Sequence, residues 1–252
     1  MTRIALITGA TAGLGAEFAR QLAAQQCSLV LVARDRGRLE ATAAQLTGEF
    51  GVAVEVLPAD LVTKAGLAAV EARLADTEHP VDVLVNNAGF GLITTFHESP
   101  IEDEDRHLDL LVAVPMRLSH AALGQMVPRR TGTIVNVASV AGYTPRGTYG
   151  AAKAWLLSFS RWANIHYRRS GVTVTAVAPG FVRTEFHQRM KARTDNIPNA
   201  LWLTPERVVA DALRAAAKGR AVTVPTLRYK VIVALSRVLP SRLVAAGALR
   251  GR

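Results

Sequence analysis

Short apolar runs alternate with longer amphipathic stretches along the first 225 residues of the chain. A continuous apolar run is typical of a strand buried on both faces of a parallel sheet, and the stretches between the runs have helical length. We expect strands at 3–8, 28–33, 52–57, 82–85, 133–138, 172–178 and 221–224, with helices at 16–24, 36–47, 64–76, 107–127, 149–168 and from 204. The regular alternation predicts a single-domain, doubly wound α/β fold with a seven-stranded parallel sheet flanked by helices.

A glycine-rich turn follows the first strand. Residues 8–15 read Thr-Gly-Ala-Thr-Ala-Gly-Leu-Gly and run into the first helix. A strand, a glycine turn and a helix N-terminus together suit a dinucleotide pyrophosphate, because glycines allow close backbone approach and the helix presents unpaired N–H groups. The alternative interpretation is a plain strand-to-helix turn.

The end of the second strand is the place where such folds select the ribose substituent. An acidic residue there would accept a hydrogen bond from a free 2′-hydroxyl, but this chain has Ala33 and then Arg34. A guanidinium offers charge and several donors to a 2′-phosphate, so we expect NADP(H). Asp35 is expected to cap the next helix, and Arg38 to be a solvated helix charge.

A tyrosine and a lysine, Tyr149 and Lys153, lie one helical turn apart. An ammonium group beside a phenol favours the phenolate and lowers the phenol pKa, so the pair can exchange a proton with a carbonyl or alcohol oxygen. By itself the pair is equally typical of a half-buried tyrosine beside a solvated lysine. Ser139 ends the fifth strand, at the sheet edge where open α/β sheets bind ligands.

The ordered set of these motifs resembles the short-chain dehydrogenase/reductase (SDR) family over residues from about 3 to 225. The set comprises Thr8-Gly9-x-x-x-Gly13-x-Gly15, Asn86-Asn87-Ala88-Gly89, Ser139, Tyr149-x-x-x-Lys153 and Pro179-Gly180. The resemblance implies a Rossmann fold and an NADP-dependent oxidoreductase that transfers a hydride between the nicotinamide and a ketone or secondary alcohol.

The resemblance also implies residue roles. Tyr149 would be the general acid and base, Lys153 would lower its pKa and hold the nicotinamide ribose, and Ser139 would bind the substrate oxygen. The other implied cofactor contacts are Gly9, Thr11, Gly13, Leu14 and Gly15 at the pyrophosphate, Arg34 at the 2′-phosphate, Asp60 and Leu61 at the adenine, Asn87, Ala88 and Gly89 at the ribose, and Pro179, Gly180, Val182 and Thr184 at the nicotinamide.

Two features depart from the family pattern. Many members have an asparagine that steadies a water where this chain has Leu111, and the segment 143–147 makes the approach from Ser139 to Tyr149 short. The short segment is compatible with a pocket open to a long chain, or with a misplaced Ser139. A lipophilic substrate such as a ketoacyl chain or a steroid is expected if the C-terminal tail lies on a membrane surface. Both departures leave room for an alternative function, a weak or inactive NADP(H)-binding sensor or scaffold. An epimerase or dehydratase on the same site is a third possibility.

Composition excludes several other classes. Cys27 is the single cysteine, which excludes a disulfide framework. His97 and His107 lie among carboxylates without repeated ligand spacing, so we expect surface histidines and no metal site. No secretory signal and no apolar window of membrane-spanning length are visible, so a cytoplasmic homo-oligomer acting on a small molecule is expected.

The net charge of +10 is concentrated at the C-terminal end, where the last acidic residue is Asp211. This distribution argues against a nucleic-acid-binding core. We therefore divide the chain into a catalytic domain at 1–225, with a substrate lid at about 185–203, and a basic amphipathic tail at 226–252. The tail is expected to pack on the domain, to form a subunit contact, or to lie on an anionic membrane surface.

Overall fold

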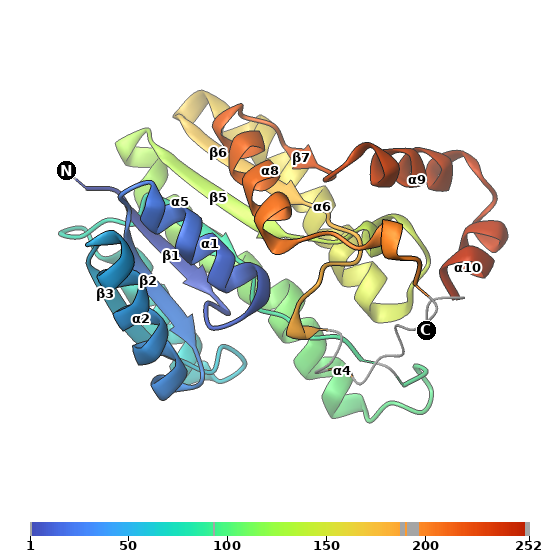
Figure 1. Cartoon of the computed structure of the whole chain (residues 1–252), viewed down its shortest axis with the longest axis horizontal. Coiled ribbons are helices and arrows are strands. Elements are labelled where there is room, and N and C mark those ends of the chain that lie inside the picture. Colours follow the sequence, from blue (N-terminus) through green and yellow to red (C-terminus); the bar gives the residue numbers. More distant parts are fainter. Residues whose placement is uncertain (1, 93, 187–189, 191–196, 250–252) are drawn as a thin grey trace.

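The computed structural model describes residues 2–92, 94–186, 190 and 197–249. Within them, seven strands form one sheet in the order β3-β2-β1-β4-β5-β6-β7, and every neighbouring pair is parallel (Figure 1). The strands are β1 Ile4–Thr8, β2 Ser28–Ala33, β3 Val54–Pro58, β4 Val83–Asn86, β5 Gly132–Val137, β6 Val172–Val177 and β7 Val222–Thr223. The predicted fold class is confirmed, and the predicted strand ends are off by a few residues.

Helices cover both faces of the sheet. They are α1 Gly13–Ala24, α2 Arg36–Phe50, α3 Lys64–Ala75, α4 Ile101–Leu108, α5 Val114–Arg129, α6 Gly147–Tyr167, α8 Pro205–Ala217, α9 Leu227–Val238 and α10 Ser241–Leu249. Successive residues of β1 point to opposite faces, so Ala5 and Ile7 pack with α1, α2 and α8, whereas Leu6 packs with α3, α5 and α6. Burial on both faces explains why the strands read as continuous apolar runs.

The helices begin at side chains that accept backbone N–H groups. Asp35 caps α2 and Thr204 caps α8, as predicted. Asp60 does not cap α3, because the Thr63 hydroxyl accepts the N–H of Gly66 in that role. The Asp60 carboxylate instead accepts the N–H of Val62 within its own loop.

The helix expected at 107–127 begins earlier, at Ile101. Its first turn contains Glu102, Asp103 and Glu104, which are favourable beside the positive end of the helix dipole. The predicted start of this helix is therefore about six residues late. A π-helical turn, Asp109–Ala113, joins α4 to α5.

The continuous helix from Ile101 to Arg129 is long and apolar enough to cross a membrane, by length and composition alone. The sequence-based statement that no window reaches this threshold is thus wrong. Its apolar side chains Val114, Leu118 and Met126 are buried in the core beneath the sheet, and such packing produces the same composition. The expected cytoplasmic location stays a prediction.

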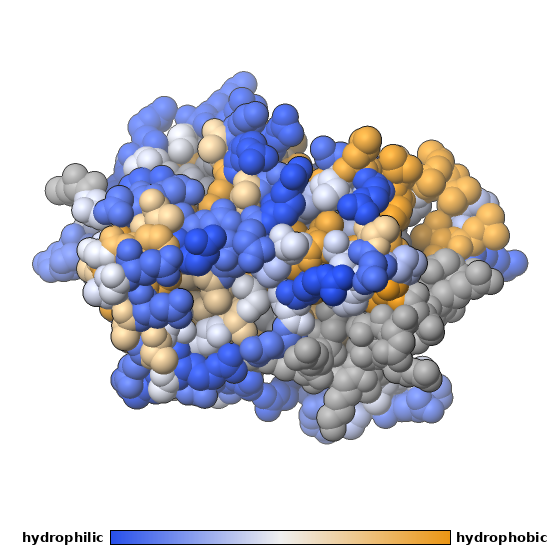
Figure 2. Space-filling view, in the orientation of Figure 1, coloured by the Kyte–Doolittle hydropathy of each residue, from blue (hydrophilic) through white to orange (hydrophobic). Residues whose placement is uncertain are grey.

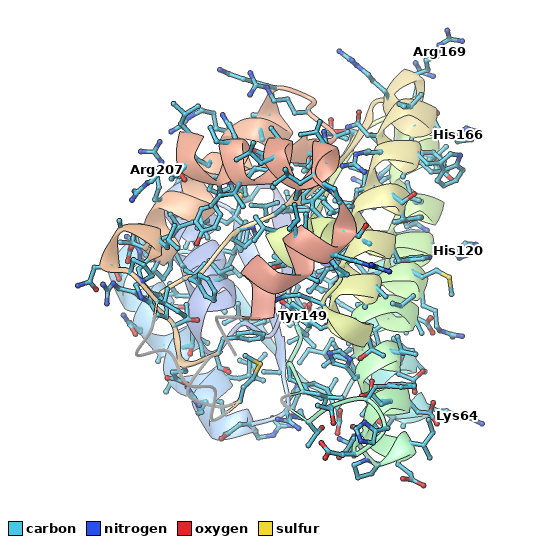
Figure 3. The ribbon with its side chains drawn as sticks, turned by 90° about the vertical axis from the view of Figure 1, so that its right-hand side faces the viewer. Lys64, His120, Tyr149, His166, Arg169 and Arg207 are labelled. Atoms are coloured by element: carbon cyan, nitrogen blue, oxygen red, sulfur yellow. The ribbon has the colours of Figure 1, made fainter. Side chains whose placement is uncertain are left out.

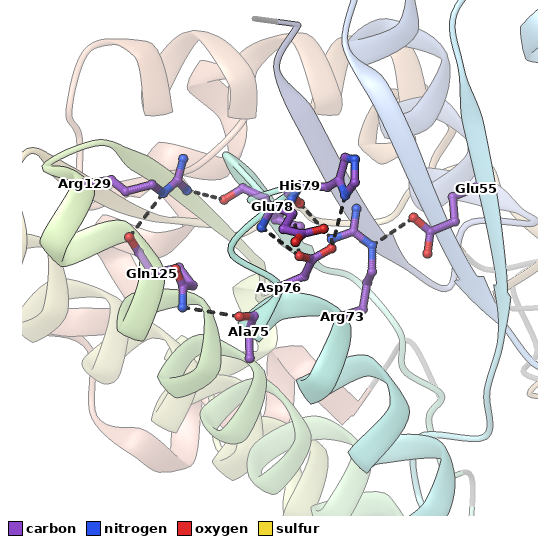
Figure 4. Close-up of polar contacts among 9 residues, drawn as sticks. Glu55, Arg73, Ala75, Asp76, Glu78, His79, Gln125 and Arg129 are labelled. Carbon is purple, nitrogen blue, oxygen red and sulfur yellow. Dashed lines mark hydrogen bonds and ion pairs between the residues drawn. The ribbon is translucent and has the colours of Figure 1, made fainter.

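Ion pairs and hydrogen bonds hold the amino edge of the sheet, where α3 leads into β4 (Figure 4). Arg73 bonds the carboxylate of Glu55 at 2.8 Å and the carbonyl of His79 at 2.9 Å. Arg129 donates to the carbonyl of Val81 at 2.8 Å, and the Asp76 carboxylate caps the N–H of Glu78. This network fixes the position of the residues just before β4. Because β4 is short, it also helps to position Asn86 and Asn87 at the carboxyl end of the strand.

The basic tail forms two helices, α9 and α10, that Pro240 divides as expected. Tyr229 and Val233 of α9 are buried, and Tyr229 joins the core cluster that α1, α2 and α8 form against the sheet. The opposite side of α9 exposes Leu227, Val231, Leu235 and Val238, which form a hydrophobic surface in Figure 2. Packing on the domain is therefore seen for one face, while a subunit contact and a membrane surface remain predictions for the other.

Candidate functional site

The strand order reverses between β1 and β4, and ligands of doubly wound sheets bind in the crevice at such a switch point. Side chains tie the two strand ends together. The Thr8 hydroxyl donates to the carbonyl of Val85 and accepts the N–H groups of Asn87 and Ala88. The Asn87 amide donates to the carbonyls of Thr8 and Gly9. These hydrogen bonds join the glycine turn and the Asn-Asn-Ala-Gly turn, both predicted from sequence, into one connected backbone surface at the base of the crevice.

The glycines of the turn are required by close backbone approach. Gly9 has φ +67°, and a Cβ on Gly15 would lie 2.1 Å from the carbonyl oxygen of Gly9. Helix α1 begins after Ala12, whose side chain provides no cap, and its first turn has no acidic residue. Its first N–H groups are thus available to an anion, and the cradle fits the pyrophosphate of a dinucleotide.

Two arginines lie beside this turn. Arg34 is exposed after β2, and its side chain makes no hydrogen bond or ion pair with the residues that the structure describes. Arg38, interpreted from sequence as a solvated helix charge, instead reaches back to donate to the carbonyl of Thr11 at 3.2 Å and pairs with Glu185 at 3.6 Å. Arg34 precedes the Asp35 cap of α2 and Arg38 lies in the first turn of that helix, so their closeness in the sequence is the signal that both stand near the glycine turn.

The predicted adenine residues follow β3. Leu61 is buried, and Asp60 is partly buried with its carboxylate turned to its own loop. The sequence also predicts that the asparagine at the end of β4 fixes a neighbouring strand. Asn86 does so: its amide donates to Asn136 of β5 at 2.8 Å, and Asn136 donates to Ser160 of α6 at 2.9 Å.

The three predicted catalytic residues come together at the carboxyl edge of the sheet. Ser139 follows β5, and its hydroxyl accepts the N–H of Ala141 while also hydrogen-bonding Tyr149. Lys153 is buried, donates to the carbonyl of Val137 at 2.7 Å, and places its ammonium 5.7 Å from the centre of the Tyr149 ring. Tyr149 is half-buried and lies near the middle of the view in Figure 3, whereas His120 and His166 lie at its right-hand edge.

Burial controls the ionisation of the pair. It raises the pKa of Tyr149 to about 12, although the Ser139 hydrogen bond and the charge of Arg146 act in the lowering direction. It also lowers the pKa of Lys153 to about 8. The expectation that Lys153 depresses the tyrosine pKa is therefore wrong for the protein alone, because the phenolate would lose its hydration. A protonated Tyr149 at neutral pH is suited to donate a proton.

His107 is not the surface residue expected from sequence. It is fully buried on α4, and its ring stacks on Tyr149 with 6.0 Å between centroids and 26° between planes. Phe90 meets the same ring edge-on at 5.3 Å, while Glu104, one turn earlier, is also buried. The acidic neighbours of His107 suggested exposure, but a spacing of three between Glu104 and His107 places both on one inward face.

The structure shows what surrounds the two features that depart from the family pattern, Leu111 and the segment 143–147. Leu111 lies in the π-helical turn, buried, and packs so close to Gly89 that a Cβ there would lie 2.8 Å from Leu111 Cδ2. In the short segment before α6, Tyr143 accepts a hydrogen bond from Arg161 and also lies beneath the guanidinium of Arg237 from α9. The tail helix therefore covers this segment.

The last predicted cofactor residues flank the opposite side of the crevice. The carbonyl of Pro179 accepts the N–H of Val140, and Val182 bridges to Leu203. Thr184 contacts the glycine turn, since a Cβ on Gly13 would lie 3.1 Å from Thr184 Cβ. Much of the predicted lid at 185–203 (187–189 and 191–196) lies outside the described residues. Among the described residues, no group of three or more His, Cys, Asp or Glu could hold a metal.

Comparison with known proteins agrees with this architecture. The family model described as short chain dehydrogenase matches residues 3–195. Oxidoreductase UcpA of Salmonella typhimurium is 33% identical over 217 residues, which cover 84% of this chain and 80% of UcpA.

Two solved structures are similar over nearly the whole chain. A short-chain dehydrogenase from Sphingobium yanoikuyae in complex with NADPH has a TM-score of 0.85 and 36% identity, covering 98% of this chain and 93% of that one. The bulky-bulky ketone specific alcohol dehydrogenase from Comamonas testosteroni has a TM-score of 0.80 and 31% identity, covering 98% and 92%. The chain therefore belongs to the short-chain dehydrogenase/reductase family of oxidoreductases that use a nicotinamide cofactor.

Proposed function

We propose that this protein is an NADP-dependent oxidoreductase that interconverts a ketone and a secondary alcohol, with Tyr149 as the general acid and base. The observation that carries the proposal is the set of half-buried Ser139 and Tyr149 and buried Lys153 at the sheet edge that also carries the glycine cradle. The NADPH bound to the Sphingobium relative and the exposed Arg34 beside Arg38 support NADP(H).

The residues divide the chemistry between them. The nicotinamide, when bound, supplies or accepts the hydride. Ser139 holds the substrate oxygen by a hydrogen bond, and Tyr149, protonated at neutral pH because burial raises its pKa, donates its proton to that oxygen. Lys153, fixed by the carbonyl of Val137, stabilises the phenolate that remains. This arrangement favours the reduction of a ketone.

The substrate is proposed to be lipophilic. Aromatic rings surround the proton donor, since Phe186 lies 6.4 Å from the Tyr149 ring and Phe90 packs behind His107. The bulky-bulky ketones of the Comamonas relative are in keeping with such a pocket. The exposed Trp162 and Ile165 on α6 support the further proposal of a homo-oligomer.

The experiment is a screen of bulky ketones, ketoacyl thioesters and ketosteroids that follows the loss of NADPH absorbance, with Tyr149→Phe as the matched variant. We expect Tyr149→Phe to lose roughly a factor of 100 or more in kcat while retaining NADPH binding. Activity that Tyr149→Phe retains in full would refute the catalytic role. NADPH binding without turnover of any carbonyl would favour the alternative, a sensor or scaffold.

A further inference from the structure

Three buried polar atoms behind the ring of Tyr149 have no hydrogen-bond partner of good geometry among the described residues. They are Oε2 of Glu104 and both ring nitrogens of His107. Glu104 is 4% exposed and His107 is 0% exposed. An unpaired buried polar atom costs about 1–3 kcal/mol, so a group of three beside a proton donor calls for a functional explanation.

The two side chains share the buried face of α4, and the His107 ring stacks on Tyr149 of α6. The charged and titratable groups that face His107 are Glu104 on its own helix and Lys153 and Tyr149 on α6. Burial lowers the pKa of His107 and Lys153 acts in the same direction, whereas Glu104 and a backbone hydrogen bond with Phe90, too poor in geometry to pair the ring nitrogen fully, act in the raising direction. A neutral imidazole has one donor and one acceptor nitrogen, which is what a group needs in order to pass a proton on.

The proposed reaction requires a proton from solvent in every cycle. Ketone, NADPH and H⁺ give alcohol and NADP⁺: the hydride forms the new C–H bond, the Tyr149 proton forms the O–H bond, and Tyr149 remains as phenolate. Lys153 can reprotonate it, because burial lowers the lysine pKa to about 8. The side chain of Lys153 is itself only 6% exposed, so after giving up its proton it must regain one through neighbouring groups.

The neighbours of Lys153 along α4 and α5 differ in their ability to carry a proton. Leu111 in the π-helical turn is buried and apolar. His107 and Glu104 lie on the preceding turns, and around them α4 exposes Glu102 and Asp103 of its first turn and Asp105 to solvent. The polar groups thus lead from the buried lysine to an acidic surface.

We propose that Glu104 and His107 return the proton from solvent at the first turns of α4 to Lys153 and Tyr149. The route rests on the proposed function, because it restores the acid which that reaction consumes. The groups are not in direct hydrogen-bond contact, so rotation of the imidazole or a bridging water completes each transfer. His107 is a positioning and relay residue that does not touch the substrate.

The decisive experiment compares one turnover with many, using the full chain, NADPH and an active ketone from the screen. The variants are His107→Leu, which fills the space without a basic nitrogen, and Glu104→Gln. We expect the steady-state kcat of His107→Leu to fall roughly 10-fold or more, with a smaller fall for Glu104→Gln. The single-turnover rate with enzyme in excess, and the KM for NADPH, stay within about 2-fold, because Tyr149 begins the first turnover protonated.

Chemical rescue by added imidazole distinguishes a role of His107 in proton transfer from a role in packing. His107→Ala leaves a cavity, and added imidazole is expected to restore most of its steady-state kcat, whereas Leu108→Ala on the exposed side of α4 keeps wild-type kcat and ignores imidazole. Far-ultraviolet circular dichroism verifies folding, and His107→Gln replaces any variant that unfolds. A wild-type kcat in His107→Leu or His107→Gln, or an equal slowing of single and multiple turnovers, overturns the relay. If Tyr149→Phe is also fully active, the proposed function fails as well; if Tyr149→Phe alone is inactive, only the relay fails.

Discussion

The ring of Tyr229 lies directly against Gly180: a Cβ at position 180 would lie 1.8 Å from Cζ of that ring. The Tyr229 hydroxyl accepts the N–H of Phe181 at 3.0 Å and donates to the carbonyl of Leu201 at 2.8 Å. The tail helix therefore holds both the Pro179-Gly180 turn and the segment that leads into α8. These two segments are where the predicted lid region begins and ends.

Tyr229→Phe keeps the ring but removes both hydrogen bonds of the hydroxyl. We expect a loss of about 1–3 kcal/mol in the free energy of unfolding and a higher KM for the ketone. Urea unfolding and steady-state kinetics measure the two effects. Val231→Ala on the exposed face of α9 is the control and should change neither; equal effects of the two variants would contradict a special role for Tyr229.

The cofactor preference is tested at Arg34. Removing a guanidinium that binds a phosphate costs about 1.5–3 kcal/mol, so Arg34→Ala should weaken NADPH binding roughly 10-fold or more while leaving NADH binding nearly unchanged. Arg38→Ala should have a smaller effect on both, because Arg38 also holds the glycine turn through Thr11. Cofactor fluorescence titration gives each dissociation constant.

The matched control for both arginines is Arg36→Ala. Arg36 lies on the same helix, exposed, and pairs with Glu40 at 3.6 Å. Arg36→Ala should leave the dissociation constants of NADPH and NADH unchanged. A loss at Arg34 that is the same for NADPH and NADH would refute its assignment to the 2′-phosphate.

Buried Lys153 predicts a pH-dependent stability. Its pKa in the folded protein is about 8, below the ordinary value of 10.5, so between these values the unfolded chain binds more protons. The free energy of unfolding that Lys153 contributes therefore rises with pH in this window and is at its lowest below pH 8. At about 1.4 kcal/mol per pKa unit, the total is about 3 kcal/mol.

Lys153→Met removes this dependence. We expect the unfolding free energy of wild type minus that of Lys153→Met to stay constant below pH 8 and to increase by about 3 kcal/mol by pH 10, where Tyr149 is still protonated in the folded state. Denaturant unfolding at several pH values measures it. Lys64→Met, at an exposed lysine, should give a constant difference; the same constancy for Lys153 would contradict the buried charge.

The sheet, the glycine turn and the meeting of Ser139, Tyr149 and Lys153 at one edge could be predicted because each depends on a local signal. Strands buried on both faces require continuous apolar runs, and the turn after β1 requires glycines at Gly9 and Gly15 for steric reasons that act within a few residues. Ser139 and Tyr149 follow strand and helix positions that a parallel sheet must bring to one edge.

The remaining features depend on contacts between distant segments. Burial of His107 behind Tyr149 requires α4 to begin at Ile101 and pack on α6, which the acidic run around it obscured. The pKa of Tyr149 is raised rather than lowered because desolvation outweighs the nearby positive charge, and desolvation is a property of the packed site. Periodicity and local sterics are therefore enough to predict the fold class and the residues that meet at the sheet edge. The surroundings of those residues follow from tertiary packing, because burial and charge depend on segments that lie far apart along the chain.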